Sequence, residues 1–197
     1  MSYEPLTSLA LFAFVSSITP GPNNLMLMAS GANFGFRRTI PHLLGVSLGF
    51  VFMASLLGTG LMTLFDAFPI TYVILKIVSV VYLFYLSWKI ATAASSDSSK
   101  TAGKPFTFLQ AASFQWVNPK VWAMAITAIS VFAPERSLWA VLLVAFIFGA
   151  INLPSVALWT AMGQQMGRFL NNQKWLRLFN YSMALLLIGS LYPVIFD

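Results

Sequence analysis

Long apolar segments constrain the fold of this chain more than any other feature. A helix needs about 20 consecutive, mostly apolar residues to cross the hydrocarbon core of a bilayer. Only 8% of the residues are charged, against roughly 25% in soluble proteins, so the chain has too few charges for a soluble or a disordered protein. The predicted fold class is therefore an all-α membrane protein with six transmembrane helices. The six apolar segments are Leu6–Ser30, Ile40–Leu64, Ile70–Ile90, Phe106–Phe132, Leu138–Met162 and Leu176–Phe196.

A polar linker at residues 92–105 divides the chain into two halves with three apolar segments each. The linker contains Ser95–Lys100, a serine-rich run that is typical of a loop. Because three is an odd number, the second half must enter the membrane upside down relative to the first half. We therefore expect one transmembrane domain, residues 1–197, built from two inverted three-helix repeats at 1–91 and 106–197.

The charges between the apolar segments predict the orientation in the membrane. Connections after the first, third and fifth segments hold eight basic residues against one acid, Asp97, whereas the other side holds four acids against one base, Arg136. Loops rich in lysine and arginine stay in the cytoplasm, so we expect both termini outside. The net charge of +6 then reflects topology and not nucleic-acid binding. The eight basic residues are Arg37, Arg38, Lys89, Lys100, Lys104, Arg168, Lys174 and Arg177.

Proline interrupts the first and the fourth apolar segment close to their centres. The first contains 19–24 (TPGPNN) and the fourth contains 118–120 (NPK). Proline has no backbone N–H and clashes with the preceding turn, so it breaks a helix and frees carbonyl oxygens. We expect helices 1 and 4 to be broken at these prolines, in corresponding places of the two repeats.

Polar residues around the two breaks are candidates for a substrate pathway. An amide or an ammonium group at this depth is costly unless it has partners, and Lys120 lies too far from the end of its segment to reach the interface. Asn152 adds an amide in the fifth segment, on the helix face that Ser155 and Trp159 share. The alternative is a pair of structural kinks whose asparagines bridge helices, and a role for Lys76 stays open. The candidate pathway residues are Thr19, Pro20, Gly21, Pro22, Asn23, Asn24, Gln115, Asn118, Pro119, Lys120 and Asn152.

The chemistry of these residues fits a small zwitterion. Helix N-termini and Lys120 favour a carboxylate, while freed carbonyl and amide oxygens can accept hydrogen bonds from an ammonium group. No Asp or Glu lies well inside any apolar segment, so the extra charge of a cationic amino acid would lack a counter-charge. The predicted substrate is therefore a small neutral amino acid or a neutral derivative.

A second pattern indicates a different class of function. Residues 45–49 (GVSLG), with His42 just before them, match the G-x-S-x-G pattern of hydrolases. That pattern needs a strand-to-helix turn and here falls in an apolar segment, so we interpret Gly45 and Gly49 as a G-x-x-x-G helix contact. The chain has one histidine and no cysteine. No catalytic residue, metal or cofactor is expected, and an intramembrane enzyme or a non-transporting subunit is the alternative from another class.

With the motifs at 19–24, 45–49 and 118–120, the chain resembles the lysine-exporter translocator family (LysE/RhtB) over nearly its whole length. The resemblance implies a multi-pass exporter of amino acids in the bacterial inner membrane, present as a homodimer in the lipid bilayer, with the two proline motifs in its pathway. Many members carry Asp where this chain has Phe50, and residues 48–50 resemble the cysteine/O-acetylserine exporter branch. Export driven by the proton gradient is the first interpretation; export of homoserine, threonine or another amino acid is the alternative.

Overall fold

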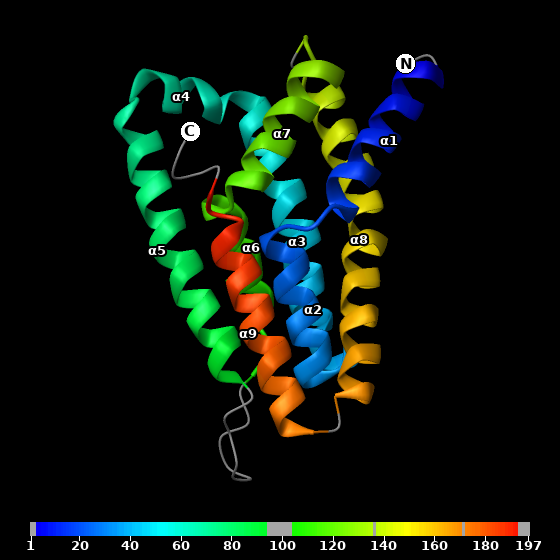
Figure 1. The fold of residues 1–197 in the computed structure, drawn as a ribbon. Coiled ribbons are helices and arrows are strands. Elements are labelled where there is room, and N and C mark those ends of the chain that lie inside the picture. The colour runs from blue at the N-terminus through cyan, green and yellow to red at the C-terminus, as the bar shows by residue number, and fades with distance from the viewer. Residues whose placement is uncertain (1–2, 94–103, 136, 171, 193–197) are drawn as a thin grey trace.

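The computed structural model describes residues 3–93, 104–135, 137–170 and 172–192, which form a bundle of helices without strands (Figure 1). A π-helical stretch, Leu57–Leu61, continues the third helix, and a 3₁₀ turn, Gln115–Val117, follows the sixth. The α-helices are α1 (Tyr3–Ile18), α2 (Pro22–Phe34), α3 (Phe36–Leu56), α4 (Met62–Ala67), α5 (Ile70–Thr92), α6 (Phe108–Phe114), α7 (Pro119–Phe132), α8 (Leu138–Phe169) and α9 (Gln173–Gly189).

Three helical stretches of the described residues are long and apolar enough to cross a membrane alone: Phe36–Leu61, Ile70–Thr92 and Leu138–Phe169. Pro5–Ile18 and Pro119–Phe132 are apolar but shorter, because each belongs to a segment that is interrupted near its centre. The described part of the chain is thus all-α, which confirms this part of the predicted fold class, and the length and composition of these helices suit a membrane protein.

The second predicted segment begins earlier than expected. Its helix starts at Phe36 and not at Ile40, because Gly35 ends α2 with a φ of 80° and turns the chain directly into α3. The side-chain oxygen of Gln164 accepts the backbone N–H of Phe36, one of the N–H groups that a helix start leaves without a partner.

The fifth and sixth predicted segments also end at other residues. α8 continues past Met162 to Phe169 because Gly163 and Gly167 let its last turns lie directly against α2. α9 ends at Gly189; the last four residues of the predicted sixth segment, 193–196, lie outside the described part of the chain. Most of the predicted linker, including Asp97 and Lys100, also lies outside the described residues. The same holds for Arg136 and Asp197.

Both predicted helix breaks are present. α1 ends at Ile18, Gly21 is fully extended, and Pro22 is the first residue of α2. In the fourth segment the chain leaves the 3₁₀ turn, adopts an extended conformation at Asn118 and starts α7 at Pro119. Proline suits both positions because the first helical residue has no N–H partner to lose. Figure 1 shows that α1 leans away from the line of α2.

Close packing between α2 and α8 depends on glycine. A Cβ atom at Gly31 would collide with the backbone oxygen of Thr160, and one at Gly163 would collide with that of Met28. At Gly167 the added Cβ would lie 2.5 Å from the backbone oxygen of Ala32. Small residues at a helix contact let two backbones approach in a membrane, where burial of apolar surface gives little driving force. The contact fixes α2, and with it the first break, against α8.

Two apolar clusters lie on either side of the breaks. One joins α1, α3, α7 and α8 and contains Phe50 stacked on Phe148, with ring centroids 4.4 Å apart. The other joins α2, α5 and α9 around Leu83 and Leu187, which are both fully buried. The broken helices pass from one cluster to the other, so the proline motifs lie between two packed layers.

We expect Gly163→Ala to lower the free energy of unfolding by about 1–3 kcal/mol, because the added methyl group meets the backbone of α2 and not a movable side chain. Chemical or thermal unfolding of the protein in detergent measures this change. Gly189→Ala is the matched control: a Cβ there meets nothing within 4 Å, so we expect a neutral change or a gain of up to about 1 kcal/mol from helix propensity. Equal stabilities for the two variants would contradict the close contact.

Candidate functional site

The two breaks face each other through a pair of amide side chains. Asn23 Nδ2 donates to Gln115 Oε1 at 2.7 Å, and Gln115 Nε2 donates back to Asn23 Oδ1 at 3.2 Å. Gln115 Nε2 also donates to the backbone oxygen of Ala111 at 2.7 Å. Both side chains are buried. Two amides that satisfy each other at this depth avoid the cost of a polar group without a partner, and they join segments that are 92 residues apart.

Lys120 lies on the carbonyl oxygens that the first break frees. Its Nζ donates to the backbone oxygen of Thr19 at 2.7 Å, to Thr19 Oγ1 at 2.9 Å and to the backbone oxygen of Pro20 at 3.3 Å. Gly21 makes room for it, since a Cβ there would lie 2.7 Å from Lys120 Cδ. The ammonium group at this depth therefore has oxygen partners, but no carboxylate partner in the described part of the chain.

The remaining asparagines of the two motifs stabilise their own breaks. Asn24 Nδ2 donates to the backbone oxygens of Ser17 and Thr19, both at 2.8 Å. Asn118 Oδ1 accepts the backbone N–H of Lys120 at 3.2 Å and so caps the start of α7. Each amide replaces a backbone partner that proline or the extended residue removes.

Asn152 connects three helices beside the first break. Its Nδ2 donates to Ser17 Oγ at 3.1 Å, and its Oδ1 accepts from Ser47 Oγ at 2.9 Å. The indole N–H of Trp159, also on α8, donates to the backbone oxygen of Ile18 at 3.0 Å. α8 thus supplies hydrogen-bond partners both for the end of α1 and for the Ser47 hydroxyl on α3.

Residues of both breaks line a small cavity of about 20 Å³, together with Asn152. A cavity needs roughly 10–15 Å³ to hold one water molecule, so this space accepts about one or two waters. An amino acid does not fit, and the described structure is therefore closed around these polar groups. The predicted residues that line the cavity are Gly21, Asn23, Asn24, Gln115, Asn118, Lys120 and Asn152.

Four predicted residues lie away from this cavity. Thr19 and Pro20 are exposed on the outer surface, and Pro22 and Pro119 line a wider groove of about 570 Å³ that also contains Lys120. Lys76, whose role the sequence leaves open, lines the same groove and not the small cavity. Thr19 still takes part in the site, because its two oxygens hold the ammonium group of Lys120.

Gly45 and Gly49 lie where α3 crosses α6. A Cβ at Gly45 would collide with the backbone oxygen of Phe108, and one at Gly49 would lie 2.7 Å from Ala112 Cα and 3.1 Å from Gln115 Cγ. The contact therefore supports the backbone next to Gln115. Ser47 donates its hydroxyl proton to Asn152 and not to His42, so residues 45–49 lack the serine–histidine contact of a hydrolase.

Two hydroxyls of the site, on Ser17 and Ser47, were not among the predicted residues. Serine in a helix usually bonds its own backbone, so a lone serine in an apolar segment gives little signal. Their place beside Asn152 depends on how α1, α3 and α8 pack, which no spacing in the sequence encodes.

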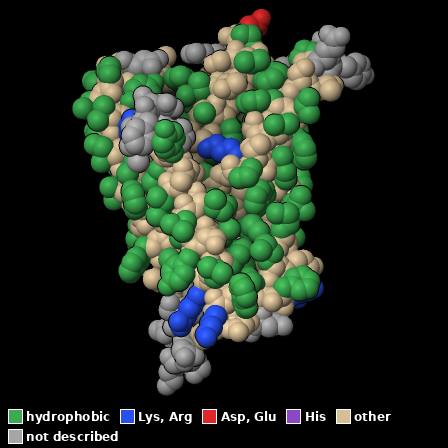
Figure 2. All heavy atoms as spheres, in the orientation of Figure 1, with side chains coloured by type: hydrophobic (Ala, Val, Ile, Leu, Met, Phe, Trp, Pro, Cys, Tyr) green, Lys and Arg blue, Asp and Glu red, His purple; other side chains and the backbone are tan. Residues whose placement is uncertain are grey.

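Charge is unevenly distributed over the surface. Figure 2 shows an outer face that is mostly hydrophobic, with basic side chains at the lower end, further basic side chains in its middle and upper parts, and an acidic side chain at the upper end. The described basic residues at the first of these ends are Arg37, Arg38, Lys89, Lys104, Arg168, Lys174 and Arg177. A hydrophobic belt, one basic end and interrupted helices with polar groups at their centre are typical of membrane transporters.

Comparisons with known proteins agree with this class. Residues 14–190 match the family described as LysE type translocator. The chain is 31% identical over 185 residues to the cysteine/O-acetylserine efflux protein of Salmonella paratyphi A and 29% identical over 185 residues to that of Escherichia coli strain K12, with 93% of both chains covered in each case. No solved structure matches it. The chain belongs to the LysE type translocator family and is a multi-pass membrane transport protein rather than an enzyme.

We expect Asn23→Leu and Gln115→Leu to be energetically coupled, because each substitution leaves the other amide with an unmet partner. A double-mutant cycle should give a coupling energy of about 0.6 kcal/mol, the average for hydrogen bonds between membrane helices, and at most about 1.7 kcal/mol. Unfolding in mixed micelles at increasing denaturing detergent measures the four stabilities. Pairing Asn23→Leu with Ser182→Ala, on the exposed side of α9, is the control and should give no coupling. Additive losses in the Asn23–Gln115 cycle would contradict the reciprocal pair.

Proposed function

We propose that this protein exports small neutral amino acids or their derivatives, such as cysteine or O-acetylserine, across the bacterial inner membrane. The observation that carries the proposal is the contact of Lys120 with the oxygens of Thr19 and Pro20, next to the Asn23–Gln115 pair. It places a cation, freed carbonyl oxygens and amides together within the span. The names of the curated relatives support cysteine-like and serine-like substrates.

A zwitterion can replace the contacts that the closed site makes with itself. Its carboxylate would pair with the ammonium group of Lys120, and its own ammonium group would take the carbonyl oxygens that Lys120 leaves. The amides of Asn23 and Gln115 offer both donors and acceptors to the same ligand. Because no acid lies within the described helices around this site, a second positive charge on the substrate would have no partner, which favours neutral side chains.

The closed cavity has to open for transport. The two breaks supply the places where the helices can bend, and the fold that supports this motion is a six-span bundle of two inverted repeats in a single domain. The support for it is the matching position of the interrupted helices, α1 with α2 and α6 with α7. Opening on one side would separate Lys120 from Thr19, and opening on the other side would release the solute.

Export fits an orientation with both termini outside and the basic end in the cytoplasm. We assign the driving force to the proton gradient, because Lys120 is the titratable side chain that the described residues place at the breaks. Two copies form the transporter. Thr19 and Pro20 are exposed, so in a lone chain the break would contact lipid at a cost, whereas a second copy over this face would cover it.

We expect Lys120→Met to lower the export rate about tenfold or more, because it removes the cation that binds the carboxylate. Uptake of labelled O-acetylserine into inside-out vesicles with an imposed proton gradient measures the rate. Lys174→Met removes an exposed cation from the basic end and should leave the rate unchanged. Size-exclusion chromatography should show that the Lys120→Met variant elutes like the wild type, which excludes unfolding as the cause of a lower rate. Full export by a folded Lys120→Met variant would refute the proposed role.

The same vesicles separate the candidate substrates. O-acetylserine and serine should compete with the label, whereas arginine should not, because its side chain lacks a counter-charge in the site. Stronger competition by homoserine or threonine would assign the protein to the alternative substrates. Preference for arginine would overturn the argument from charge.

The proposed orientation can be tested with single cysteines, since the chain has none of its own. We expect Glu135→Cys to react with a membrane-impermeant maleimide in intact cells and Lys174→Cys to react only after permeabilisation. Both side chains are exposed and lie at opposite ends of α8 and its flanking turns, so they form a matched pair. The reverse labelling pattern would place the termini inside.

A further inference from the structure

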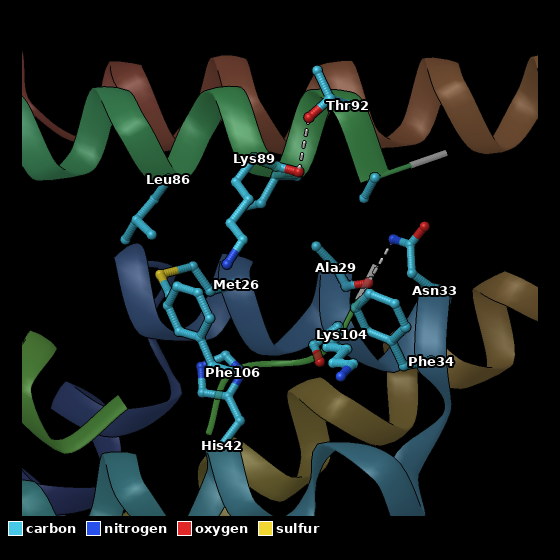
Figure 3. A pocket seen from close by; sticks show the side chains of 13 residues that line it. Met26, Ala29, Asn33, Phe34, His42, Leu86, Lys89, Thr92, Lys104 and Phe106 are labelled. Atoms are coloured by element: carbon cyan, nitrogen blue, oxygen red, sulfur yellow. Dashed lines mark hydrogen bonds between the residues drawn. The ribbon is translucent and has the colours of Figure 1, made fainter. Parts of the chain in front are cut away.

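A second cavity lies at the basic end of the bundle, separate from the breaks. It has a volume of about 190 Å³ and lies between α2, α3 and α5, with Lys104 and Phe106 at its side. At the same 10–15 Å³ per water molecule that applies to the cavity at the breaks, this space holds on the order of ten waters and suits a small solute. Figure 3 shows side chains of all three helices pointing into it, among them His42 and Lys89.

His42 is the polar group in this cavity that lacks a partner. Its side chain is 2% exposed, and neither ring nitrogen has a hydrogen-bond partner among the residues that the structure describes. Burying a polar group without a partner is costly, and such groups are rare in folded proteins. A neutral imidazole offers one donor and one acceptor. The ring therefore has unused capacity for a ligand that carries both kinds of group.

Other polar groups along the cavity are already paired. Asn33 exchanges hydrogen bonds with Asn180 at 2.9 and 3.1 Å, and the Ser30 hydroxyl lies 2.9 Å from that of Thr39. Thr92 donates to the backbone oxygen of Trp88 at 2.9 Å. These contacts leave His42 and the two lysines as the groups that can respond to a ligand.

Two lysines give the cavity a positive charge. The ammonium nitrogen of Lys89 lies 5.0 Å from the centre of the Phe106 ring, and the same ring lies 5.2 Å from the ring centre of His42. Lys104 lines the cavity next to Phe106. The described acids Glu4, Asp66 and Glu135 belong to α1, α4 and the turn after α7, which lie at the opposite end of the bundle in Figure 1. A cavity with two cations and, among the described residues, no acid beside them favours an anionic group.

We infer that this cavity is a loading site that binds the carboxylate of a dipolar amino acid at the basic end, before the solute reaches the breaks. Lys89 and Lys104 attract the carboxylate, and His42 supplies a hydrogen bond at the buried end of the cavity. The inference rests on the proposed function for the identity of the solute. A phospholipid headgroup could also contact the two exposed lysines, but it does not account for a buried imidazole without a partner.

The test uses protection of a single cysteine. Thr92 lines the cavity and is exposed, so Thr92→Cys can react with a maleimide in protein reconstituted into phosphatidylcholine vesicles. O-acetyl-L-serine at about ten times its dissociation constant should slow the reaction about tenfold, as expected for a site that is mostly occupied. Its methyl ester, which has no carboxylate, should give no protection. Thr63→Cys, on an exposed residue of α4, is the control and should react at the same rate throughout.

Variants then show which groups bind the ligand. In the Thr92→Cys background, His42→Leu should weaken binding about tenfold, the effect of losing one hydrogen bond to a charged group. The double variant Lys89→Gln/Lys104→Gln changes only exposed side chains and should abolish protection. The test therefore does not depend on whether His42→Leu folds. Lys174→Gln, at the same end but outside the cavity, should keep full protection.

The outcomes separate this inference from the proposed function. Export by the wild type without protection of Thr92→Cys would overturn the loading site and leave the proposed function standing. Protection of Thr92→Cys without export by the wild type would overturn the proposed function and leave the binding site standing. Protection by phosphatidylglycerol in the vesicles, without any effect of O-acetylserine, would assign the lysines to lipid and overturn the inference. A loading site also predicts that His42→Leu raises the KM for export about tenfold with little change in the maximal rate, whereas Lys120→Met lowers the maximal rate.

Discussion

The contact between the two helix breaks is the constraint on which the rest of the structure depends. A bilayer offers no water to a backbone carbonyl, so a break in a transmembrane helix persists only where protein groups replace the lost partners. Lys120 supplies three hydrogen bonds to Thr19 and Pro20, and Asn23 and Gln115 satisfy each other. The second break therefore supplies the partners that the first break lacks, while Asn118 caps the start of α7 itself. The first break would lose these partners if the fourth segment were a continuous apolar helix.

These contacts require that the interrupted helices keep fixed positions, and α8 holds α1 and α2 in place. Its glycines lie against α2, so the first break cannot shift without separating two backbones in close contact. Its polar residues Asn152 and Trp159 reach the end of α1 from the same helix. α8 therefore both positions the first break and restricts its movement. The helices can bend at the extended residues Gly21 and Asn118.

The sequence predicted the breaks but not the partners of their polar groups. Proline acts on its own turn, so Pro20, Pro22 and Pro119 could be assigned without knowledge of the fold. Lys120 was expected to need a partner, yet its acceptors lie about a hundred residues away in the chain and depend on tertiary packing. For the same reason Ser17 and Ser47 were missed, and α8 was predicted too short, because the contact of Gly163 and Gly167 with α2 keeps polar residues helical.

The two cavities differ in a way that suits sequential binding. The cavity at the basic end is larger, positively charged and contains an imidazole without partners, whereas the cavity at the breaks is nearly filled by groups that bind one another. A solute would enter the first at little cost in broken hydrogen bonds, but it can enter the second only by displacing Lys120 from Thr19 and Pro20. In the proposed pathway that displacement opposes binding, so the central site would hold its ligand weakly enough to release it, which any transport pathway requires.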